Sequence, residues 1–500
     1  MILTIAFYLL LLPIFAVGLL ELHLVYKYIT NYRKKISRLQ KNLAPLNVED
    51  PDVPFVTVQL PIFNEKFVVD RLLRSVAEIE YPHNKLEIQL LDDSTDDTPA
   101  VAAETIASLQ EQFPDLQISH VQREDRVGYK AGALQYGLKD AKGEFIAVFD
   151  ADFVPPPNFL IKTIPYFHDQ EVGVVQTRWG HINEKFSLLT RLQAFMLNAH
   201  FSVEQAGRNA GDCFINFNGT AGVWRRTTID DAGGWEADTL TEDLDLSYRA
   251  QLKKWKFVYL RDQISPAELP ATIDAFKSQQ HRWNKGGAET AKKLAWRILT
   301  SDLPFGKKIH AAAHLTYFTN YLFVFLVGLL SVPLLYCFHV DPQTVEVSRS
   351  VAVLAALSML CYAIYFCTAY TSFSNRPWWW KIGEFVVMYP LFLSFFLGMS
   401  FHNAIAIVEG YLGFKSPFVR TPKLAVVKQA PNWTQSAVYL SRRMNLYSYI
   451  EGLLAVYFIA AAVIGLSIGQ YELVILHVQF GLGFVLMFIF SVANAMHAEA

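Results

Sequence analysis

Long apolar stretches and a polar central region divide the chain. Residues 1–26 are almost entirely apolar, and Lys27 opens a basic segment directly after them. Five further apolar stretches follow residue 300, at about 311–339, 351–373, 382–401, 449–470 and 473–495. Because an α-helix needs roughly 20 apolar residues to cross a bilayer, these stretches predict an integral membrane protein.

The central region, from about residue 53 to 300, has the pattern of a soluble α/β domain. Its predicted strands are short runs rich in β-branched residues, at 56–61, 86–93, 116–122, 144–152 and 172–179. Helical patterns alternate with them, and one begins near Thr98, which suits an N-cap, with Pro99 as the first helical residue. The alternation predicts a parallel sheet covered by helices on both faces. Ligands of such sheets bind at the carboxyl ends of the strands.

Positive charge indicates which parts of the chain face the cytoplasm. A secretory signal carries its charge before a shorter apolar core, whereas here the charge follows the apolar stretch, as in a membrane anchor. The positive-inside rule then places the residues after Lys27 in the cytoplasm. The loop at 413–447 is also rich in lysine and arginine, so we expect it on the same side. If all three preceding stretches crossed, that loop would lie outside.

One segment must therefore not cross, and 382–401, which contains Glu384 and Pro390, is the best candidate. We predict one span before the central domain and four after it, with 377–413 interfacial or re-entrant. The predicted organisation has six parts: an anchor at 1–26, a basic cytoplasmic linker at 27–52, an α/β domain at 53–300, two spans at 301–376, interfacial helices with a cytoplasmic loop at 377–448, and two spans with a short tail at 449–500.

Composition narrows the class of protein further. Hydrophobic residues make up 52% of the 500 residues and charged residues 18%, against about 25% charged residues in soluble domains. A net charge of −2 gives no support for a nucleic-acid partner. The four cysteines lack metal-ligand spacing and three lie in apolar stretches, so we interpret them as buried hydrophobic residues. A disordered chain and a disulfide-stapled secreted module are both excluded.

Four aspartates stand at the ends of two predicted strands. Asp92 and Asp93 follow LEIQLL, and Asp150 and Asp152 follow FIAVF. If these strands are neighbours, the four carboxylates meet at one edge of the sheet. Hard cations such as Mg2+ and Mn2+ take carboxylate oxygens and bridge phosphates, so a metal and a nucleotide would stabilise the group. The alternatives are a solvated loop at Asp150 and Asp152 and a helix cap at Asp93.

Charged residues at two helix starts extend this candidate site. Lys130, in GYKAGAL, suits an anionic phosphate near a helix N-terminus, and an ordinary solvated lysine is the alternative. Glu242 and Asp243 open the helical pattern of LDLSYRAQLKKW. They fit the preference for negative charge at a helix start, and a carboxylate in this place could also deprotonate an acceptor hydroxyl.

A third group of polar and aromatic residues precedes the later apolar stretches. Gln279, Arg282 and Trp283 lie together in QQHRW. Arginine offers several donors to phosphate oxygens, and tryptophan offers a flat face on which a sugar ring can stack. An Arg–Trp pair near a membrane is also typical of an interfacial anchor, so both interpretations stay open. The chain has no Walker loop, nucleophile elbow or zinc pattern.

In this order, the motifs resemble those of the membrane-embedded family 2 glycosyltransferases, and the cellulose-synthase-like mannan and glucan synthases are the most similar. The resemblance covers most of 53–290 and rests on LPIFNE, LLDDSTDDT, GYKAGAL, FDADF, FNGTAGVWRR, AGGWEADTLTEDLDLSYRA and the QxxRW string at Gln279, Arg282 and Trp283. It implies a GT-A fold, a Rossmann-like α/β catalytic domain, here inserted between transmembrane helices. It also implies inverting transfer from a nucleotide-diphosphate sugar.

The resemblance implies a role for each motif residue. Asp243 would be the general base, with Glu242 beside it in the catalytic group. The residues expected to bind the nucleotide sugar are Asp92, Asp93, Lys130, Asp150, Asp152, Gln279 and Arg282. Asp152, together with Asp150, would hold Mg2+ or Mn2+, and Trp283 and Gly219 would line the acceptor site. The string at 418–423 is similar to the gating loop of cellulose synthases, although Arg420 stands where that pattern has valine.

These features lead to one expected function and two rivals. We expect a processive synthase that polymerises hexoses from GDP-mannose or UDP-glucose into a β-linked polysaccharide and exports it through its own spans. Transfer of a single sugar to a lipid is the first rival, and a non-enzymatic assembly subunit is the second. The expected partners are the sugar donor, the growing glycan and membrane lipid, while accessory subunits stay open. The expected location is the plasma (inner) membrane, with the catalytic domain in the cytoplasm.

Overall fold

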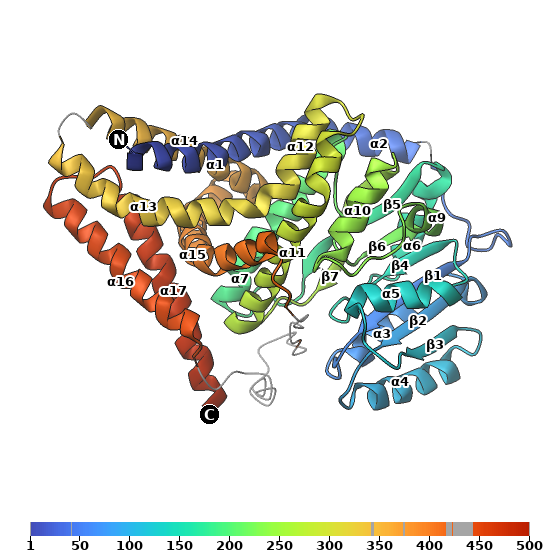
Figure 1. Cartoon of the computed structure of the whole chain (residues 1–500). Coiled ribbons are helices and arrows are strands. Elements are labelled where there is room, and N and C mark those ends of the chain that lie inside the picture. The colour runs from blue at the N-terminus through green and yellow to red at the C-terminus, as the bar shows by residue number, and fades with distance from the viewer. Residues whose placement is uncertain are drawn as a thin grey trace.

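The structure, a computed structural model, has an α/β domain at one end and long apolar helices at the other (Figure 1). It describes residues 2–41, 43–341, 345–373, 376–416, 423 and 444–499. The predicted arrangement, an α/β domain inserted between candidate membrane helices, is confirmed.

The α/β domain is built on one seven-stranded sheet with the strand order β3-β2-β1-β4-β6-β5-β7. The strands are β1 (Val56–Ile62), β2 (Leu86–Asp92), β3 (Gln117–Gln122), β4 (Phe145–Val148), β5 (Val172–His181), β6 (Gly222–Arg225) and β7 (Lys256–Ala267). Strands β3, β2, β1 and β4 run parallel, but β6 is antiparallel to both of its neighbours, β4 and β5. The sheet is therefore mixed, and the prediction of a parallel sheet is wrong at β6.

The five predicted strands are present, whereas β6 and β7 were not predicted. Strand β6 has only four residues, which is too short for a readable alternation of apolar and polar positions. Nearly every residue of β1 and β2 is buried. Continuous burial along a strand means that both faces of the sheet are covered, as the sequence pattern predicted.

Pairing register brings three strand ends to one edge of the sheet. Ile62 of β1 lies beside Asp92 of β2, and Gln59 of β1 lies beside Val148 of β4. Strand β4 thus ends three residues before the end of β1, and the chain that follows it continues to the same edge, beginning with the Phe149 N–H, which bonds to the Gln59 carbonyl oxygen. This edge is where the sequence pattern placed the candidate ligand site.

Nine α-helices surround the sheet in the described part of this domain. They are α3 (Val69–Ala77), α4 (Thr98–Gln112), α5 (Tyr129–Asp140), α6 (Phe159–Thr163), α7 (Leu188–Ala199), α8 (Gln205–Ala210), α9 (Arg226–Asp231), α10 (Glu242–Leu252) and α11 (Ile273–Leu299). Helix α4 begins at Thr98 and not after it, because the Asp96 carboxylate accepts the Thr98 backbone N–H at 2.9 Å. The start therefore lies one residue before the predicted position.

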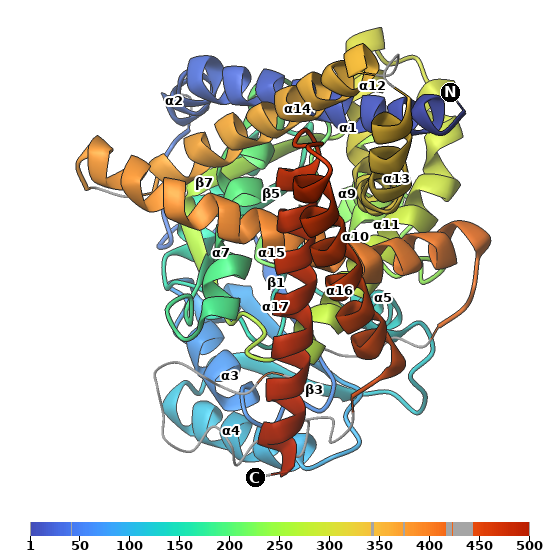
Figure 2. The ribbon, with the colours of Figure 1, turned by 90° about the vertical axis from the view of Figure 1, so that its left-hand side faces the viewer.

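The remaining helices form the apolar end of the molecule. They are α1 (Ile2–Lys27), α12 (Phe305–Thr316), α13 (Asn320–Val340), α14 (Val345–Thr371), α15 (Trp378–Leu412), α16 (Leu446–Ser467) and α17 (Val474–Glu499). The exception is the short basic helix α2 (Arg33–Lys41), which packs on the α/β domain through Ile36 (Figure 1). Among the described residues, six helical segments are long and apolar enough to cross a membrane. Helices α16 and α17 lie side by side (Figures 1 and 2).

Both ends of α15 contact the α/β domain. Near its start, the Phe385 ring lies 6.2 Å from an aromatic ring of α7, between ring centres. Near its end, Glu409 contacts His281 of α11 at 3.0 Å. A methyl group at Gly410 would lie 2.6 Å from the carbonyl oxygen of Lys285, so only glycine permits this close crossing of α15 and α11. Helix α15 is thus held against the domain along its length.

Candidate active site

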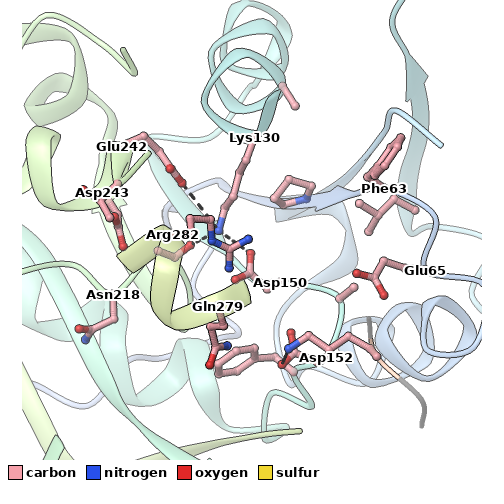
Figure 3. Close-up of a pocket in the computed structure, with 18 of the residues that line it drawn as sticks. Phe63, Glu65, Lys130, Asp150, Asp152, Asn218, Glu242, Asp243, Gln279 and Arg282 are labelled. Atoms are coloured by element: carbon pink, nitrogen blue, oxygen red, sulfur yellow. Dashed lines mark hydrogen bonds and ion pairs between the residues drawn. The ribbon is translucent and has the colours of Figure 1, made fainter. Parts of the chain in front are cut away.

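A cavity of about 160 Å3 opens where β1, β2 and β4 end (Figure 3). It is lined by residues from elements far apart in the sequence. Ten of the eleven predicted site residues line it: Asp93, Lys130, Asp150, Asp152, Gly219, Glu242, Asp243, Gln279, Arg282 and Trp283. The structure therefore brings together nearly all the residues that the motifs singled out.

Asp92 is the predicted residue that does not line the cavity. Its side chain is fully buried, contacts His120 of β3 at 2.9 Å and accepts the Ser94 backbone N–H at 2.9 Å. Successive residues of a strand point to opposite faces, so Asp92 and Asp93 diverge. The geometry gives Asp92 a structural role and lends no support to its predicted contact with a nucleotide.

Two carboxylates on the floor of the cavity are each paired with a lysine. Asp150 accepts a hydrogen bond from Lys130 of α5 at 2.5 Å, and Lys130 also donates to the carbonyl oxygen of Gly219 at 2.8 Å. Burial works against the charge of Lys130, but the Asp150 and Glu242 carboxylates outweigh it and raise the lysine pKa. Lys130 is therefore a fixed positive charge inside the cavity.

Asp152 binds a lysine from the far end of the chain. Its Oδ2 atom lies 2.6 Å from Nζ of Lys423, and both side chains are almost fully buried. Lys423 is the described residue of the gating-like string at 418–423, and the rest of that string lies outside the described residues. Each of the two carboxylates thus binds a lysine ammonium group in this structure. Carboxylate oxygens are also the ligands that a hard divalent ion prefers.

Glu242 and Asp243 stand at the start of α10 and face different neighbours. Glu242 lies 4.0 Å from the Lys130 ammonium group. Asp243 accepts the Leu244 backbone N–H at 2.8 Å and lines the same side of the cavity as Glu242 (Figure 3). Burial, followed by the nearby Glu242 carboxylate, raises the pKa of Asp243 to about 7. A carboxylate with this pKa exchanges protons readily near neutral pH.

Gly219 fits between these charged groups because it has no side chain. Its φ angle is +78°, in the left-handed region that favours glycine. A methyl group there would lie 3.0 Å from Oδ2 of Asp243 and 3.4 Å from the Lys130 nitrogen. Gly219 therefore sets the separation between the candidate base and the candidate phosphate-binding lysine.

Helix α11 supplies the other wall of the cavity. Gln279, Arg282 and Trp283 recur at three- and four-residue spacing, so they share one face of the helix. Burial lowers the pKa of Arg282, but the carboxylates of Glu242, Asp150, Asp243 and Asp152 oppose that shift. Arginine keeps its charge in proteins, so the half-buried Arg282 adds a second positive charge facing the same space as Lys130.

Three residues near the cavity were not predicted as site residues. Arg123 binds both oxygens of Asp93 and also donates to the Val127 carbonyl oxygen. The Arg126 guanidinium lies 3.3 Å from the centre of the Phe63 ring, and both side chains line the cavity. A flat, charged stack of this kind suits a nucleobase. Arg126 lies four residues before Lys130 in the sequence, but nothing in the sequence placed Phe63 beside it.

A second cavity, of about 180 Å3, continues from the first towards the apolar helices. Asp243, Trp283, Asn218, Thr241 and Trp179 line both cavities. Asp243 therefore lies at the junction, with the phosphate-binding charges on one side and an aromatic chamber on the other. We refer to the second cavity as the acceptor chamber.

Another acidic group lies elsewhere on the domain. Glu236, Asp238 and Asp245 are close enough together to share an ion. Lys293 already contacts all three carboxylates, at 2.5, 2.8 and 3.0 Å. This lysine neutralises the group, which therefore makes a weaker metal site than the acids of the main cavity.

Comparison with known proteins accounts for this arrangement. Residues 51–286 match the family model described as "Glycosyltransferase like family 2". The central region is a family 2 glycosyltransferase domain. A similarity to a solved structure supports the fold prediction. The chain is similar to a mannosyltransferase from Pyrobaculum calidifontis whose structure was solved with GDP-Man and Mn2+. That match has a TM-score of 0.52 and 19% identity over 83% of this chain and all of that one. The fold is GT-A.

The family 2 domain has plant relatives as well. Glucomannan 4-beta-mannosyltransferase 1 of Oryza sativa subsp. japonica is 42% identical over 278 residues, which is 53% of each chain. Glucomannan 4-beta-mannosyltransferase 2 of Arabidopsis thaliana is 40% identical over 301 residues, covering 59% of this chain and 55% of that one. This chain spans about half the length of the curated relatives that it matches.

Proposed function

We propose that the protein transfers a hexose, with inversion, from a nucleotide-diphosphate sugar to an acceptor hydroxyl. The position of Asp243 carries this proposal. Its carboxylate lies between a cavity with two half-buried cations, Lys130 and Arg282, and an aromatic chamber. A displacement at the anomeric carbon needs a base on the acceptor side and positive charge on the leaving side. This site supplies both.

Each residue of the site has a place in that reaction. The Asp243 carboxylate takes the proton of the acceptor hydroxyl as its oxygen attacks the anomeric carbon. The bond from that carbon to the diphosphate oxygen breaks, and the nucleoside diphosphate leaves with the electron pair. Lys130, Gln279 and Arg282 hold the departing diphosphate, and Phe63 with Arg126 holds the nucleobase. Trp283 and Gly219 border the acceptor.

Asp150 and Asp152 are the residues that would hold a Mg2+ or Mn2+ ion. Their oxygens line the cavity, and each now binds a lysine ammonium group. When bound, such a metal ion neutralises negative charge on the diphosphate. The donor set therefore supports metal dependence, in agreement with the Mn2+ named for the Pyrobaculum protein.

Replacing Lys423 with methionine should strengthen metal binding. The Lys423 ammonium group occupies Oδ2 of Asp152, so an incoming cation must displace it. We expect the K423M variant to bind Mn2+ up to about tenfold more tightly, which corresponds to roughly 1.4 kcal/mol. Electron paramagnetic resonance of free Mn2+ during a titration measures this directly. Unchanged Mn2+ affinity together with weaker donor binding would instead make Lys423 a ligand of the donor.

The sugar and the product extend the proposal beyond the site. The relatives are named glucomannan 4-beta-mannosyltransferases, which supports GDP-mannose as the donor, with UDP-glucose as the alternative. We propose that repeated transfer builds a β-linked polysaccharide. Transfer of a single sugar to a lipid is the second candidate, and the apolar helices beside the acceptor chamber favour it.

One experiment tests the proposed function. Purified protein is incubated with a panel of nucleotide sugars and Mg2+ or Mn2+, and the product is analysed for size and linkage. We expect turnover of one hexose donor, loss of turnover with a chelator, and a long insoluble product. A product soluble in organic solvent would support the lipid alternative, and no release of nucleotide from any donor would refute transferase activity.

We also propose a cytoplasmic domain at the plasma (inner) membrane and export of the product, with α15 not crossing. Contacts of Phe385 and Glu409 with the domain support this, because they bring both ends of α15 beside it. A cysteine in place of Lys415 should react with a membrane-impermeant maleimide only from the cytoplasmic side. Product protected inside inverted vesicles would support export.

A further inference from the structure

The acceptor chamber is followed by a second chamber deeper among the apolar helices. This inner chamber, of about 130 Å3, lies between α1, α13, α14, α15 and α17. Aromatic side chains shared by the two chambers separate them: Tyr317, Tyr321, Phe366, Phe392 and Phe396. A molecule that begins at Asp243 and extends away from the donor therefore meets the two chambers in turn.

The acceptor chamber holds buried polar atoms that lack partners. Asn218 accepts hydrogen bonds at Oδ1 from Asn216 and Gln205, at 2.8 and 3.1 Å, which fixes the direction of its amide. Within the part of the chain that the structure describes, Nδ2 of Asn218, Nε2 of Gln280 and Oδ1 of Asn284 have no hydrogen-bond partner. All three side chains are more than nine-tenths buried. Buried polar groups without partners are unfavourable, so these atoms indicate a hydroxylated ligand.

The size and walls of the acceptor chamber fit one sugar. A cavity needs only about 10–15 Å3 to hold one water molecule, so a chamber of about 180 Å3 has room for a ligand the size of a sugar ring. Trp179 stacks on Phe201 at 4.7 Å and lies 6.5 Å from Trp283, between ring centres. These rings offer flat faces to a pyranose, and the three amides offer hydrogen bonds to its hydroxyls.

The inner chamber has the opposite character. Its walls include Leu11, Val324, Met359 and Phe480, and most of its polar side chains are already engaged. The hydroxyls of Ser358 and Tyr389 donate to backbone carbonyl oxygens at 2.8 and 3.2 Å. Among the described lining residues, the amide nitrogen of Asn320 is the unpartnered exception.

A glycan in this inner chamber would lose its water and gain few hydrogen bonds, which is unfavourable. An alkyl or isoprenoid chain would lose nothing there, because burial of apolar surface is favourable. The two chambers together therefore have the shape of an amphiphile, with a sugar head beside Asp243 and an apolar tail among the helices.

We propose that the acceptor that starts each product chain is a glycolipid, with one hexose in the acceptor chamber and its apolar tail in the inner chamber. The inference rests on the proposed transferase function and assigns the class of its first acceptor. It also assigns acceptor binding to Asn218, Gln280 and Asn284.

Paired acceptors test this proposal in protein reconstituted into phosphatidylcholine nanodiscs. The probes are the methyl and hexyl β-glycosides of mannose and of glucose. Each buried methylene group strengthens binding about fourfold, so partial burial of the longer chain should lower the acceptor KM at least tenfold for the hexyl glycoside. Equal KM values for the methyl and hexyl compounds would overturn the proposal while leaving transferase activity intact. No nucleotide release with any acceptor would instead refute the proposed function.

Substitutions in α14 distinguish binding of the alkyl tail in the inner chamber from partition of that tail into the bilayer. Ala355 of α14 lines the inner chamber, and A355F should raise the KM of the hexyl glycoside towards that of the methyl glycoside, which itself stays unchanged. Ala352→Phe, on the same helix but outside the chamber lining, is the matched control and should preserve the difference. If A355F also preserves it, the longer chain acts through the bilayer and the proposal fails.

Asn284→Leu tests the sugar head independently. This nearly isosteric change removes the unpartnered oxygen, so the KM of both glycosides should rise about tenfold while the donor KM stays the same. An unchanged acceptor KM would remove Asn284 from the acceptor site. Circular dichroism and the donor KM verify that the variant is folded.

Discussion

Replacing Asp243 with asparagine should lower the rate of hexosyl transfer by about three orders of magnitude, which corresponds to roughly 4 kcal/mol of barrier. The amide cannot take the acceptor proton, yet it keeps the size and the Leu244 hydrogen bond of the carboxylate. Binding of the nucleotide should change little, because Lys130, Gln279 and Arg282 remain. Steady-state transfer and calorimetric nucleotide binding measure the two effects separately.

Glu242→Gln is the matched control for this experiment. Glu242 faces Lys130, and its charge helps to raise the pKa of Asp243. The E242Q variant should retain transfer, and the acid limb of its kcat–pH profile should shift to lower pH. In the wild type, kcat should rise with pH through about 7, since only the deprotonated carboxylate accepts a proton. Loss of transfer in E242Q with retention in D243N would assign the base to Glu242.

Stability offers an independent check on the same residue. A carboxyl group whose pKa is raised in the folded state destabilises the fold as pH rises above its unfolded value of about 3.9. The D243N variant should therefore melt at a higher temperature than the wild type at pH 8, and by a smaller margin at pH 5. A lower melting temperature at pH 8 would contradict the burial of a charged Asp243.

Replacing Arg282 with alanine should have the second largest effect, a loss in kcat of about 100- to 1000-fold. Arg282 is half-buried and lies near the Glu242, Asp150, Asp243 and Asp152 carboxylates. Its removal takes positive charge away from the leaving diphosphate and leaves those carboxylates less well balanced. We expect weaker binding of the nucleoside diphosphate as well, measured by calorimetry.

Arg282→Lys should recover only part of the activity, because an ammonium group cannot reproduce the planar pair of donors of arginine. Arg297→Ala is the matched control, since Arg297 lies exposed on the same helix. If R297A loses as much activity as R282A, the effect comes from α11 as a whole and not from the guanidinium in the cavity.

Much of the site could be predicted because its residues directly adjoin strand ends and helix starts, which short sequence patterns reveal. Asp150 and Asp152 directly follow an apolar run, and Glu242 and Asp243 open an amphipathic helix. The choice between Asp92 and Asp93 could not be made in the same way. It depends on which face of the sheet each residue meets, and the answer came from His120 and Arg123 on neighbouring segments.

Other features depend on contacts that no local pattern contains. Strand β6 reverses direction between β4 and β5, and its four residues carry no signal of orientation. Lys423 lies 271 residues from Asp152 in the sequence. The unpartnered amide of Asn218 exists only because Asn216 and Gln205 fix its orientation. Such tertiary pairings are decided by packing, and a single sequence does not reveal them.

Helix α11 connects the apolar helices mechanically with the cavity. One of its faces carries Arg282, the proposed ligand of the donor. Its first turns contact two apolar helices: Lys277 lies 2.6 Å from Glu451 of α16, and Asp274 accepts a hydrogen bond from Asn494 of α17 at 2.6 Å. A helix transmits a push along its axis with little loss. We expect tension or thickness changes in the surrounding bilayer that tilt α16 or α17 to move Arg282 as well, and thereby to change the rate of the proposed transfer.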